Sequence, residues 1–273
     1  MEVTGLNFTR PTSHQRKILK VFQDLRDVLL SGNDYMRLRL IWITVSQCCY
    51  YSSSLYKSSK RECGYALNAF IFSLTGVLEK IVKTFGRIDI FCNNAGIINE
   101  KHWEKTIAIN LGGVVRGTYL ALEHMKKENG GNGGVIVNVS SMAGLGPFPM
   151  APIYTATKHG VVGFSRAMAA VSKLANYGVR INILCPWFVK TNLLSSMNSE
   201  EHIGSFFPLK GITETMMQKR GCLEADVVAK AFLVLVKDES KNGDVLMIDP
   251  DEAVFISLPE RAKDFPSTPV SLE

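Results

Sequence analysis

The sequence predicts an α/β fold with a doubly wound parallel sheet. From residue 74 onward, short apolar runs of strand length alternate with longer runs of helical periodicity. The short runs carry hydrophobic residues at consecutive positions, as expected for strands that helices cover on both faces. No Pro- or Gly-rich linker divides the 273 residues, so we expect a single domain.

The elements of the first 75 residues are the least regular. A helix is expected from Ser13, as N-cap, to Gly32, because apolar residues at 18, 22, 25 and 29 share one face. Residues 38–45 are β-branched and apolar and predict a strand. Residues 46–64 show no clear period, so no element is assigned to them.

The remaining elements follow from periodicity and from their end signals. Apolar residues at helical spacing predict a helix from Leu74 to Phe85, which Gly86 ends. Further helices are predicted over 103–128, 154–177 and 224–236. Strands are predicted over 88–92, 135–139, 180–185 and 244–248, the last of the series. This alternation is typical of a parallel sheet with crossover helices.

Three residues indicate proton-transfer chemistry. Tyr154 and Lys158 are four positions apart in a predicted helix, so both side chains project from one face. An ammonium group beside a phenol favours the phenolate and is expected to lower the tyrosine pKa from about 10. Ser141, at the end of a predicted strand, is placed to hold the reacting oxygen. The pattern favours a reaction on an alcohol or a carbonyl.

Context gives this spacing its weight, because Tyr56 and Lys60 have the same spacing in a Ser-rich polar stretch. Such a pair alone is more often an exposed tyrosine near a solvated lysine. Tyr154, however, follows a series of polar residues at the ends of strand-like runs, namely Asn93-Asn94, Asn110 and Ser140-Ser141. Open α/β sheets bind their ligands at the carboxyl ends of the strands.

An ordered series of motifs gives the chain a family resemblance. The series comprises Asn93-Asn94-Ala95-Gly96, Asn99-Glu100-Lys101, Trp103–Thr106, Ile109-Asn110-Leu111, Ser140-Ser141, Tyr154–Gly160, Gly178-Val179-Arg180 and Asn242-Gly243. From about Gly76 to the C-terminus the chain resembles the short-chain dehydrogenase/reductase family, in its NAD-dependent, prostaglandin-oxidising branch. The resemblance implies a Rossmann-like sheet, with 1–75 as an atypical N-terminal segment and 76–273 as the catalytic region.

The resemblance implies catalytic roles for four of these residues. Tyr154 would be the general base in alcohol oxidation, and Lys158 would lower its pKa and bind the nicotinamide ribose. Ser141 would stabilise the substrate oxygen, and Asn110 would anchor a water that links Lys158 to solvent. Two alternatives stay open: Asn110 as a core polar residue that bends its helix, and Ser140 in place of Ser141.

It also implies a cofactor pocket and a substrate pocket. Asn93 and Asn94 would line the adenosine side of the cofactor, although the pair could equally form a turn. Val189 and Thr191 would hold the nicotinamide carboxamide. Ala151 stands where this branch suggests a polar, substrate-binding side chain. Trp187 stands where the family usually has glycine, and an indole there must turn away or crowd the pocket.

The activity implied is NAD-dependent oxidation of a secondary alcohol, on a hydroxyprostaglandin or related hydroxy-lipid, to a ketone. The resemblance further implies a homodimer through the helices at 103–128 and 154–177. One feature argues against this activity. Members of the family begin with Thr-Gly-x-x-x-Gly-x-Gly, whose backbone binds the cofactor pyrophosphate, and residues 1–75 lack that spacing. The alternative is therefore a catalytically inactive relative that acts as a binding or dimer partner.

Composition argues against three other classes of protein: metal-binding, membrane or secreted, and nucleic-acid-binding proteins. The six cysteines include no Cys-x-x-Cys pair, which argues against a metal site and for reduced thiols. No apolar stretch approaches the ~20 residues that a bilayer span needs, and no signal pattern is present. We therefore expect a cytoplasmic protein.

The net charge of +6 lies mostly in residues 1–72. Without a nucleic-acid motif, this excess favours a solvated helix face over a lipid or nucleic-acid surface.

Overall fold

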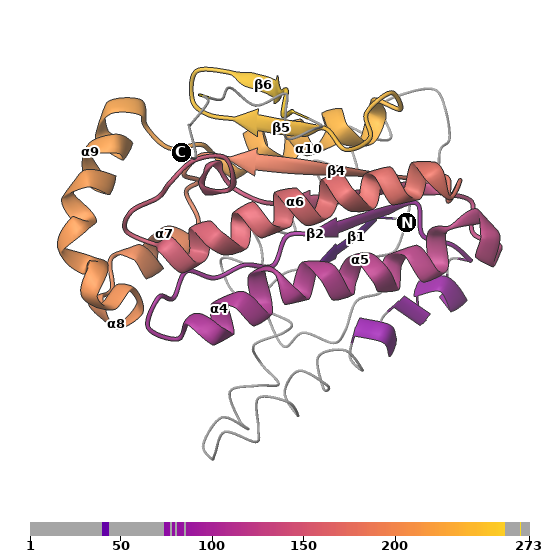
Figure 1. Cartoon of the computed structure of the whole chain (residues 1–273), viewed down its shortest axis with the longest axis horizontal. Coiled ribbons are helices and arrows are strands. Elements are labelled where there is room, and N and C mark those ends of the chain that lie inside the picture. The colour runs from indigo at the N-terminus through magenta and orange to yellow at the C-terminus, as the bar shows by residue number, and fades with distance from the viewer. Residues whose placement is uncertain are drawn as a thin grey trace, which may run out of the picture.

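The computed structural model describes residues 74–76, 78–79, 81–84, 86–259 and 268, together with the backbone of residues 40–43. Within this part of the chain one six-stranded sheet runs in sequence order (Figure 1). Its first five strands are parallel and the sixth is antiparallel to the fifth. The strands are β1 (Leu40–Ile43), β2 (Ile90–Asn93), β3 (Gly134–Val139), β4 (Val179–Pro186), β5 (Val245–Ile248) and β6 (Ala253–Ile256). The predicted α/β class is confirmed.

The strand expected at 38–45 is present as β1 and belongs to the same sheet. It pairs in parallel with β2, with Leu40 opposite Ile90 and Ile43 opposite Asn93. The atypical N-terminal segment thus contributes a strand beside β2, and β2 is not an edge strand. The helix expected over 13–32 and the aperiodic stretch 46–64 lie outside the described residues.

The helix predicted before β2 is confirmed where it is described. Residues 74–76, 78–79 and 81–84 are helical, with Leu74 and Leu78 buried. Gly86 ends the helix with a φ of +84°, and its N–H donates to the Val82 carbonyl at 2.7 Å. Glycine suits this position because it adopts left-handed conformations without strain.

The single helix expected over 103–128 is wrong, because the structure has two: α4 (Trp103–Asn110) and α5 (Gly112–Met125). Leu111 interrupts the run with a φ of −105°. The Asn110 amide is bonded to the backbone of Ile97, outside the helix, and two glycines follow. Glycine weakens helix interiors by about 1 kcal/mol relative to alanine, so Gly112 and Gly113 make the turn after Asn110 a weak place in the helical run.

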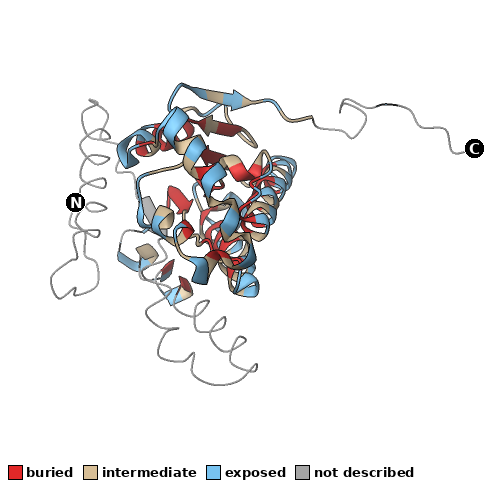
Figure 2. Cartoon of the chain, turned by 90° about the vertical axis from the view of Figure 1, so that its left-hand side faces the viewer, coloured by how far each residue is buried: buried red, intermediate tan, exposed pale blue. Residues whose placement is uncertain are grey.

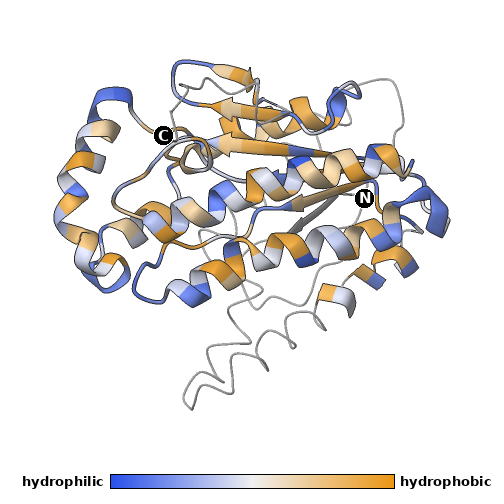
Figure 3. Cartoon of the chain, viewed as in Figure 1, coloured by the Kyte–Doolittle hydropathy of each residue, from blue (hydrophilic) through white to orange (hydrophobic). Residues whose placement is uncertain are grey.

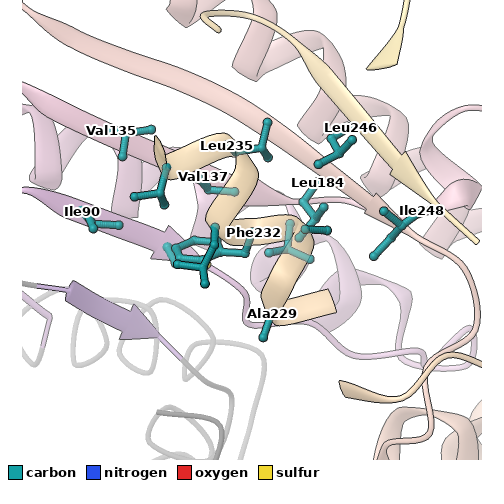
Figure 4. Close-up of a cluster of buried hydrophobic side chains, with 14 of the residues drawn as sticks. Ile90, Val135, Val137, Leu184, Ala229, Phe232, Leu235, Leu246 and Ile248 are labelled. Carbon is teal, nitrogen blue, oxygen red and sulfur yellow. The ribbon is translucent and has the colours of Figure 1, made fainter. Parts of the chain in front are cut away.

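Helices cover both faces of the sheet. Phe91, Ile136 and Ile181 pack on the face covered by α5 and by α6 (Pro152–Leu174). Strand neighbours such as Val135 and Val137 pack on the other face, against Phe232 and Leu235 of α10 (Ala225–Lys237) (Figure 4). Figures 2 and 3 show the result, with buried, apolar strands between helices whose outer faces are exposed and more polar. The alternation follows from the two-residue period of a strand.

Four short elements between β4 and α10, together called the cover below, were not predicted. They are α7 (Asn192–Met197), α8 (Glu200–Ile203), η3 (Gly204–Leu209) and α9 (Lys210–Arg220). Figure 1 shows them beyond the carboxyl end of β4. Each is too short, or too polar in the case of α9, for a periodic apolar stripe to identify it from sequence. Strand β6 was missed for the same reason.

Candidate active site

The residues predicted to carry the chemistry lie at the carboxyl ends of β3 and β4. Ser141 follows β3 and begins a short 3-10 turn, in which its Oγ accepts the Ala143 N–H at 3.2 Å. Tyr154 and Lys158 lie in the first two turns of α6. Because α6 packs across the end of β3, all three residues meet at one place.

Tyr154 is buried, with 6% of its surface exposed. Burial raises the pKa of its phenol to about 12, although a hydrogen bond with Ser141 opposes the shift. The lowered pKa expected from the Tyr-Lys spacing is therefore wrong for the protein alone. The cost of placing a phenolate among apolar groups exceeds what the hydrogen bond with Ser141 contributes.

Lys158 is buried as deeply, at 3% exposure, and shares one helix face with Tyr154 as predicted. Its Nζ donates to the Val139 carbonyl at 2.9 Å and lies 5.5 Å from the centroid of the Tyr154 ring. Burial lowers the pKa of Lys158 to about 8, with electrostatic interaction with Cys185 in opposition. The lysine is thus poised to exchange a proton near neutral pH.

Asn110 joins three segments around this pair. Its Oδ1 accepts the Ile97 N–H at 2.8 Å, and its Nδ2 donates to the Ile97 carbonyl at 2.9 Å and to Thr157 Oγ1 at 3.2 Å. A Cβ placed on Gly96 would lie 3.5 Å from Asn110 Oδ1 and 3.6 Å from Lys158 Nζ. Asn110 and Lys158 therefore both face the backbone of Gly96, and the asparagine ties the loop after β2 to α6.

The two asparagines at the end of β2 differ in environment. The Asn93 side chain is inside the core, where its Nδ2 donates to Asn138 Oδ1 at 2.8 Å and to Thr118 Oγ1 at 3.2 Å. Any contact from Asn93 to a cofactor would have to come from its backbone. Asn94 is half-buried and follows directly on the strand end. Of the pair, only Asn94 is left with its side chain outside this internal network.

The two serines after β3 also differ. Ser140 is buried and donates to the Lys158 carbonyl at 2.8 Å, so it holds the backbone of α6. Ser141 is the serine that bonds to the Tyr154 phenol. The structure thus brings Ser141, and not Ser140, to the phenol side of Tyr154.

An apolar wall adjoins Tyr154. Ala151, the N-cap of α6, is fully buried in this wall. Buried members of the same cluster come from the loop after β2, the segment before α6 and the cover, namely Ile98, Ala143, Phe148, Met150, Met197 and Ile203. Phe188, Leu193, Leu194, Phe206, Phe207 and Leu209 pack against them. Such a lining suits an apolar substrate.

The segment after β4 carries the two remaining predicted residues. Val189 makes a parallel bridge to Leu223 and is half-buried. Thr191 is exposed and is the N-cap residue of α7. Both therefore belong to the strand-end loop that leads into the cover, on the β4 side of the site.

Comparisons with known proteins agree with this geometry. The sequence profile described as short chain dehydrogenase matches residues 73–202. The 15-hydroxyprostaglandin dehydrogenase [NAD(+)] of Homo sapiens is 42% identical over 196 residues, which cover 72% of this chain and 71% of that protein. The chain belongs to the short-chain dehydrogenase family.

Three other similar proteins share between 31% and 41% of their aligned residues with this chain. The 15-hydroxyprostaglandin dehydrogenase [NAD(+)] of Bos taurus is 41% identical over 200 residues, with 73% of each chain covered. An uncharacterised oxidoreductase of Thermotoga maritima is 34% identical over 210 residues, covering 71% of this chain and 79% of that protein. The crystal structure of levodione reductase matches with a TM-score of 0.54 and 31% identity, over 66% of this chain and 72% of that one.

Trp187 is this dehydrogenase's departure from the usual family glycine, and its indole turns toward the end of the cover. The indole Nε1 donates to the Gly221 carbonyl at 3.1 Å. The Arg220 guanidinium lies 5.3 Å from the ring centroid and also donates to Asp249 at 2.8 Å. Trp187 thus packs under Arg220 at the end of α9, so the indole is held by the cover.

Glu100 is a residue of the site that sequence reasoning did not identify. Its Oε2 accepts the Ile153 N–H at 2.9 Å and its Oε1 accepts the Tyr154 N–H at 3.0 Å. More than 50 positions separate the partners, so no local spacing signals the contact.

Within the described residues no group of three His, Cys, Asp or Glu side chains is arranged to hold a metal ion. No helix in that part of this dehydrogenase is long and apolar enough to span a bilayer.

Proposed function

We propose that this dehydrogenase oxidises a secondary alcohol of a hydroxyprostaglandin or related hydroxy-lipid to the ketone, with hydride transfer to NAD and with Tyr154 as general base. The observation that carries the proposal is the meeting of Ser141, Tyr154 and Lys158 at the carboxyl ends of β3 and β4 beside an apolar wall. The names of the relatives at 41–42% identity supply the cofactor and the substrate class.

The nicotinamide half of NAD fits the residues present. A lysine ammonium has three hydrogens, and the Val139 carbonyl accepts one from Lys158, which leaves donors for the ribose hydroxyls. Gly96 leaves open space beside the same ammonium that a side chain would fill. Lys158, with Val189 and Thr191 on the β4 side and Asn94 on the β2 side, would hold the cofactor.

In the proposed reaction the protein positions the alcohol and moves one proton. The bound nicotinamide supplies the hydride acceptor and a positive charge that favours the phenolate. Ser141 donates to the substrate oxygen, and Tyr154 Oη takes the hydroxyl proton as the carbonyl double bond forms. Lys158 compensates the phenolate charge, and Asn110 keeps the loop at Gly96 and α6 in register. Ala151 and its apolar neighbours exclude water from the alkyl part of the substrate.

One observation favours a second candidate, in which the chain is inactive and acts as a binding or dimer partner. Residues 1–75 contain no Thr-Gly-x-x-x-Gly-x-Gly, so the glycines that let a backbone receive the pyrophosphate are missing from the sequence. The two candidates differ in one measurable property, which is the affinity of the full chain for NAD.

Calorimetric titration of the full chain with NAD separates them. Saturable binding, followed by NADH formation with a hydroxyprostaglandin, supports the dehydrogenase. Tyr154→Phe should then bind NAD but lose at least about a hundredfold of kcat without unfolding. No binding at millimolar NAD overturns the proposal in favour of the inactive relative. Binding without turnover of any secondary alcohol overturns the catalytic part alone.

We further propose that the enzyme is a cytoplasmic homodimer. Tyr119 on α5 and Val171 and Leu174 on α6 are large apolar side chains that stay exposed, Leu174 at 85%. α5 and α6 lie side by side, and Tyr119 packs edge-on against Phe164. Exposed apolar side chains gathered on adjacent helices are typical of a surface that a second copy covers.

A further inference from the structure

We infer that Glu100 is a positioning residue for Tyr154: it caps the N-terminus of α6 from the loop before α4 and ties it to the cover. The inference deepens the proposed function and rests on it. Glu100 has 7% of its surface exposed, and its carboxyl group contacts only the first turn of α6 among the bonds described for its side chain.

The first turn of α6 needs such a partner. The first N–H groups of any helix lack carbonyl partners within it, and a polar N-cap side chain usually accepts one. Here the N-cap is Ala151, which has no acceptor, and Pro152 has no N–H to satisfy. The Thr155 N–H already bonds to the Ala151 carbonyl at 2.9 Å. That leaves the N–H groups of Ile153 and Tyr154, the two that Glu100 accepts.

The acceptor is itself held in place. Asn99 Oδ1 accepts the His102 N–H at 2.8 Å, and the Asn99 carbonyl accepts Thr106 Oγ1 at 2.6 Å. The turn that presents Glu100 is thereby anchored to α4. The Glu100 and Lys101 N–H groups both donate to the His202 carbonyl, at 2.7 and 3.2 Å, so the same turn is bonded to α8 of the cover.

Glu100 acts on Tyr154 more than on Lys158. Lys158 is one turn further along α6 and is held separately, through its Nζ by the Val139 carbonyl and through its own carbonyl by Ser140. Loss of the Glu100 bonds would therefore displace the phenol relative to a lysine that stays in place. Ile203 and Met197 of the cover lie in the same buried cluster as Tyr154, and the His202 carbonyl accepts the Glu100 N–H. The turn at Glu100 thus connects the cover to the base.

The first test compares Glu100→Gln with Glu201→Gln, the same change at an exposed residue of α8. A glutamine has one acceptor oxygen where Glu100 uses two, so one N–H of α6 loses its partner. We expect kcat to fall at least about tenfold, because small displacements of a reacting group carry large rate costs. The KM for NAD should change less than about twofold, since Lys158 keeps its own bonds.

The pH profile separates positioning from lost stability. The Ser141 bond opposes the rise in the Tyr154 pKa, so moving the phenol away from Ser141 shifts the acidic limb of kcat, which reports the NAD-bound enzyme, to higher pH. A change that merely unfolded part of the sample would lower kcat at every pH and leave the limb in place. An unmoved limb with a kcat equal to that of Glu201→Gln overturns the inference.

A rescue experiment covers the case in which Glu100→Gln folds poorly. A hollow of about 380 Å³ opens onto Glu100, lined also by Lys101, Glu200, Ile203, Gly204, Ser205 and Phe206. In Glu100→Ala a small carboxylate can enter there and accept the same two N–H groups. Formate should restore kcat at least about fivefold over chloride at equal ionic strength. Equal activity in formate and chloride counts against the inference.

Hydrogen exchange keeps this inference separate from the proposed function. If the unaltered chain turns over no alcohol, the proposed function fails. The exchange of the Ile153 and Tyr154 amides then decides the inference by itself. Faster exchange at these two amides in Glu100→Gln than in Glu201→Gln upholds the cap, and equal exchange rejects it.

Discussion

At the scale of single residues, burial decides the chemistry of the site. Tyr154 and Lys158 are almost completely enclosed, and enclosure moves their pKa values apart, to about 12 and about 8. Each shift disfavours the charged form, so at neutral pH the phenol keeps its proton, while the lysine ammonium begins to lose its proton just above neutral pH. An active phenolate has to be created by what binds beside it, which is the part proposed above for the positive charge of the nicotinamide.

The pH dependence of turnover follows from the Tyr154 pKa. Oxidation uses the phenolate, whose fraction in the free enzyme rises about tenfold per pH unit below a pKa of about 12. We expect kcat/KM for alcohol oxidation to rise with a slope close to one between pH 6.5 and 8.5. Ketone reduction uses the phenol and should not rise. Steady-state rates in both directions check this, and a flat oxidation profile would contradict it.

The lowered pKa of Lys158 leads to a second prediction, on how the stability of the protein depends on pH. Its folded pKa of about 8 lies below the ordinary 10.5, so from pH 8 to 10.5 the unfolded chain binds more protons. The cost of burying the ammonium is present in full below pH 8 and disappears as pH rises through that window. The unaltered chain should therefore gain stability over this window, and Lys158→Met should not. Measured in urea, the free energy of unfolding of Lys158→Met should fall by about 1 kcal/mol relative to that of the unaltered chain between pH 8 and 9.

Lys173→Met, at the exposed end of the same helix, controls for removal of a positive charge. A stability difference between Lys158→Met and the unaltered chain that stays constant from pH 7 to 9 would show that the buried lysine pays no such cost.

Residue types and local spacing were enough to find part of this site. Tyr154 and Lys158 lie on one face because four residues make a helical turn, a property of the chain segment itself. The direction of the Tyr154 pKa was mispredicted, because burial is a property of the whole fold. Glu100 was overlooked because its partners are more than 50 positions away, and Asn93 was assigned to the cofactor although its amide serves the core.

At the scale of elements, the packing of α5 on the sheet depends on a glycine, Gly117, which has no side chain. Gly117 lies over the end of β2, where an added Cβ would overlap Asn93 Oδ1. The Asn93 amide is the centre of a buried network with Thr118 and Asn138, and Asn138 Nδ2 continues it to Ser165 on α6 at 2.8 Å. A side chain at Gly117 would thus disturb the junction of β2, β3, α5 and α6.

Two glycines of the same helix give a matched pair. Gly117→Ala should destabilise the protein by about 1–3 kcal/mol, because Asn93 must move and leave buried partners unsatisfied. Gly113→Ala meets nothing within 4 Å, and alanine favours a helix, so it should stabilise by up to about 1 kcal/mol. Urea unfolding of both variants measures the difference. Equal effects would mean that the network tolerates a methyl group at position 117.

Regular elements were predictable and irregular ones were not. The strands at 135–139 and 180–185 were predicted to within two residues, because most of their residues are apolar. The break between α4 and α5 escaped prediction, since it depends on where the Asn110 amide finds its partners. The cover consists of pieces that are fixed by packing on Tyr154 and its neighbours and not by their own periodicity.

At the scale of the whole molecule, the sheet is asymmetric in what surrounds it. One face carries α5 and α6, whose outer surfaces hold exposed Tyr119, Val171 and Leu174. The other face carries α10, which also exposes valines, Val227 and Val234. The α5–α6 surface has the larger and more exposed side chains, and we assign the proposed dimer contact to it.

Sedimentation tests that assignment. The unaltered chain should sediment as a dimer at micromolar concentration, and Leu174→Lys should raise the monomer fraction, because it places a charge in an apolar contact. Val234→Lys on α10 is the control and should leave the dimer intact. A monomer for the unaltered chain would refute the dimer, and equal effects of both substitutions would refute its location.

The position of Trp187 gives the enzyme a built-in optical signal. The indole is packed under the Arg220 guanidinium and bonded to the Gly221 carbonyl, both at the C-terminal end of α9, where the chain leaves the cover. Indole emission depends on nearby cations and on solvent contact, so any displacement of α9 changes the brightness or colour of this tryptophan. Once Trp42 and Trp103 are replaced by phenylalanine, a residue that departs from the usual family glycine lets the cover be followed by fluorescence, with no added label.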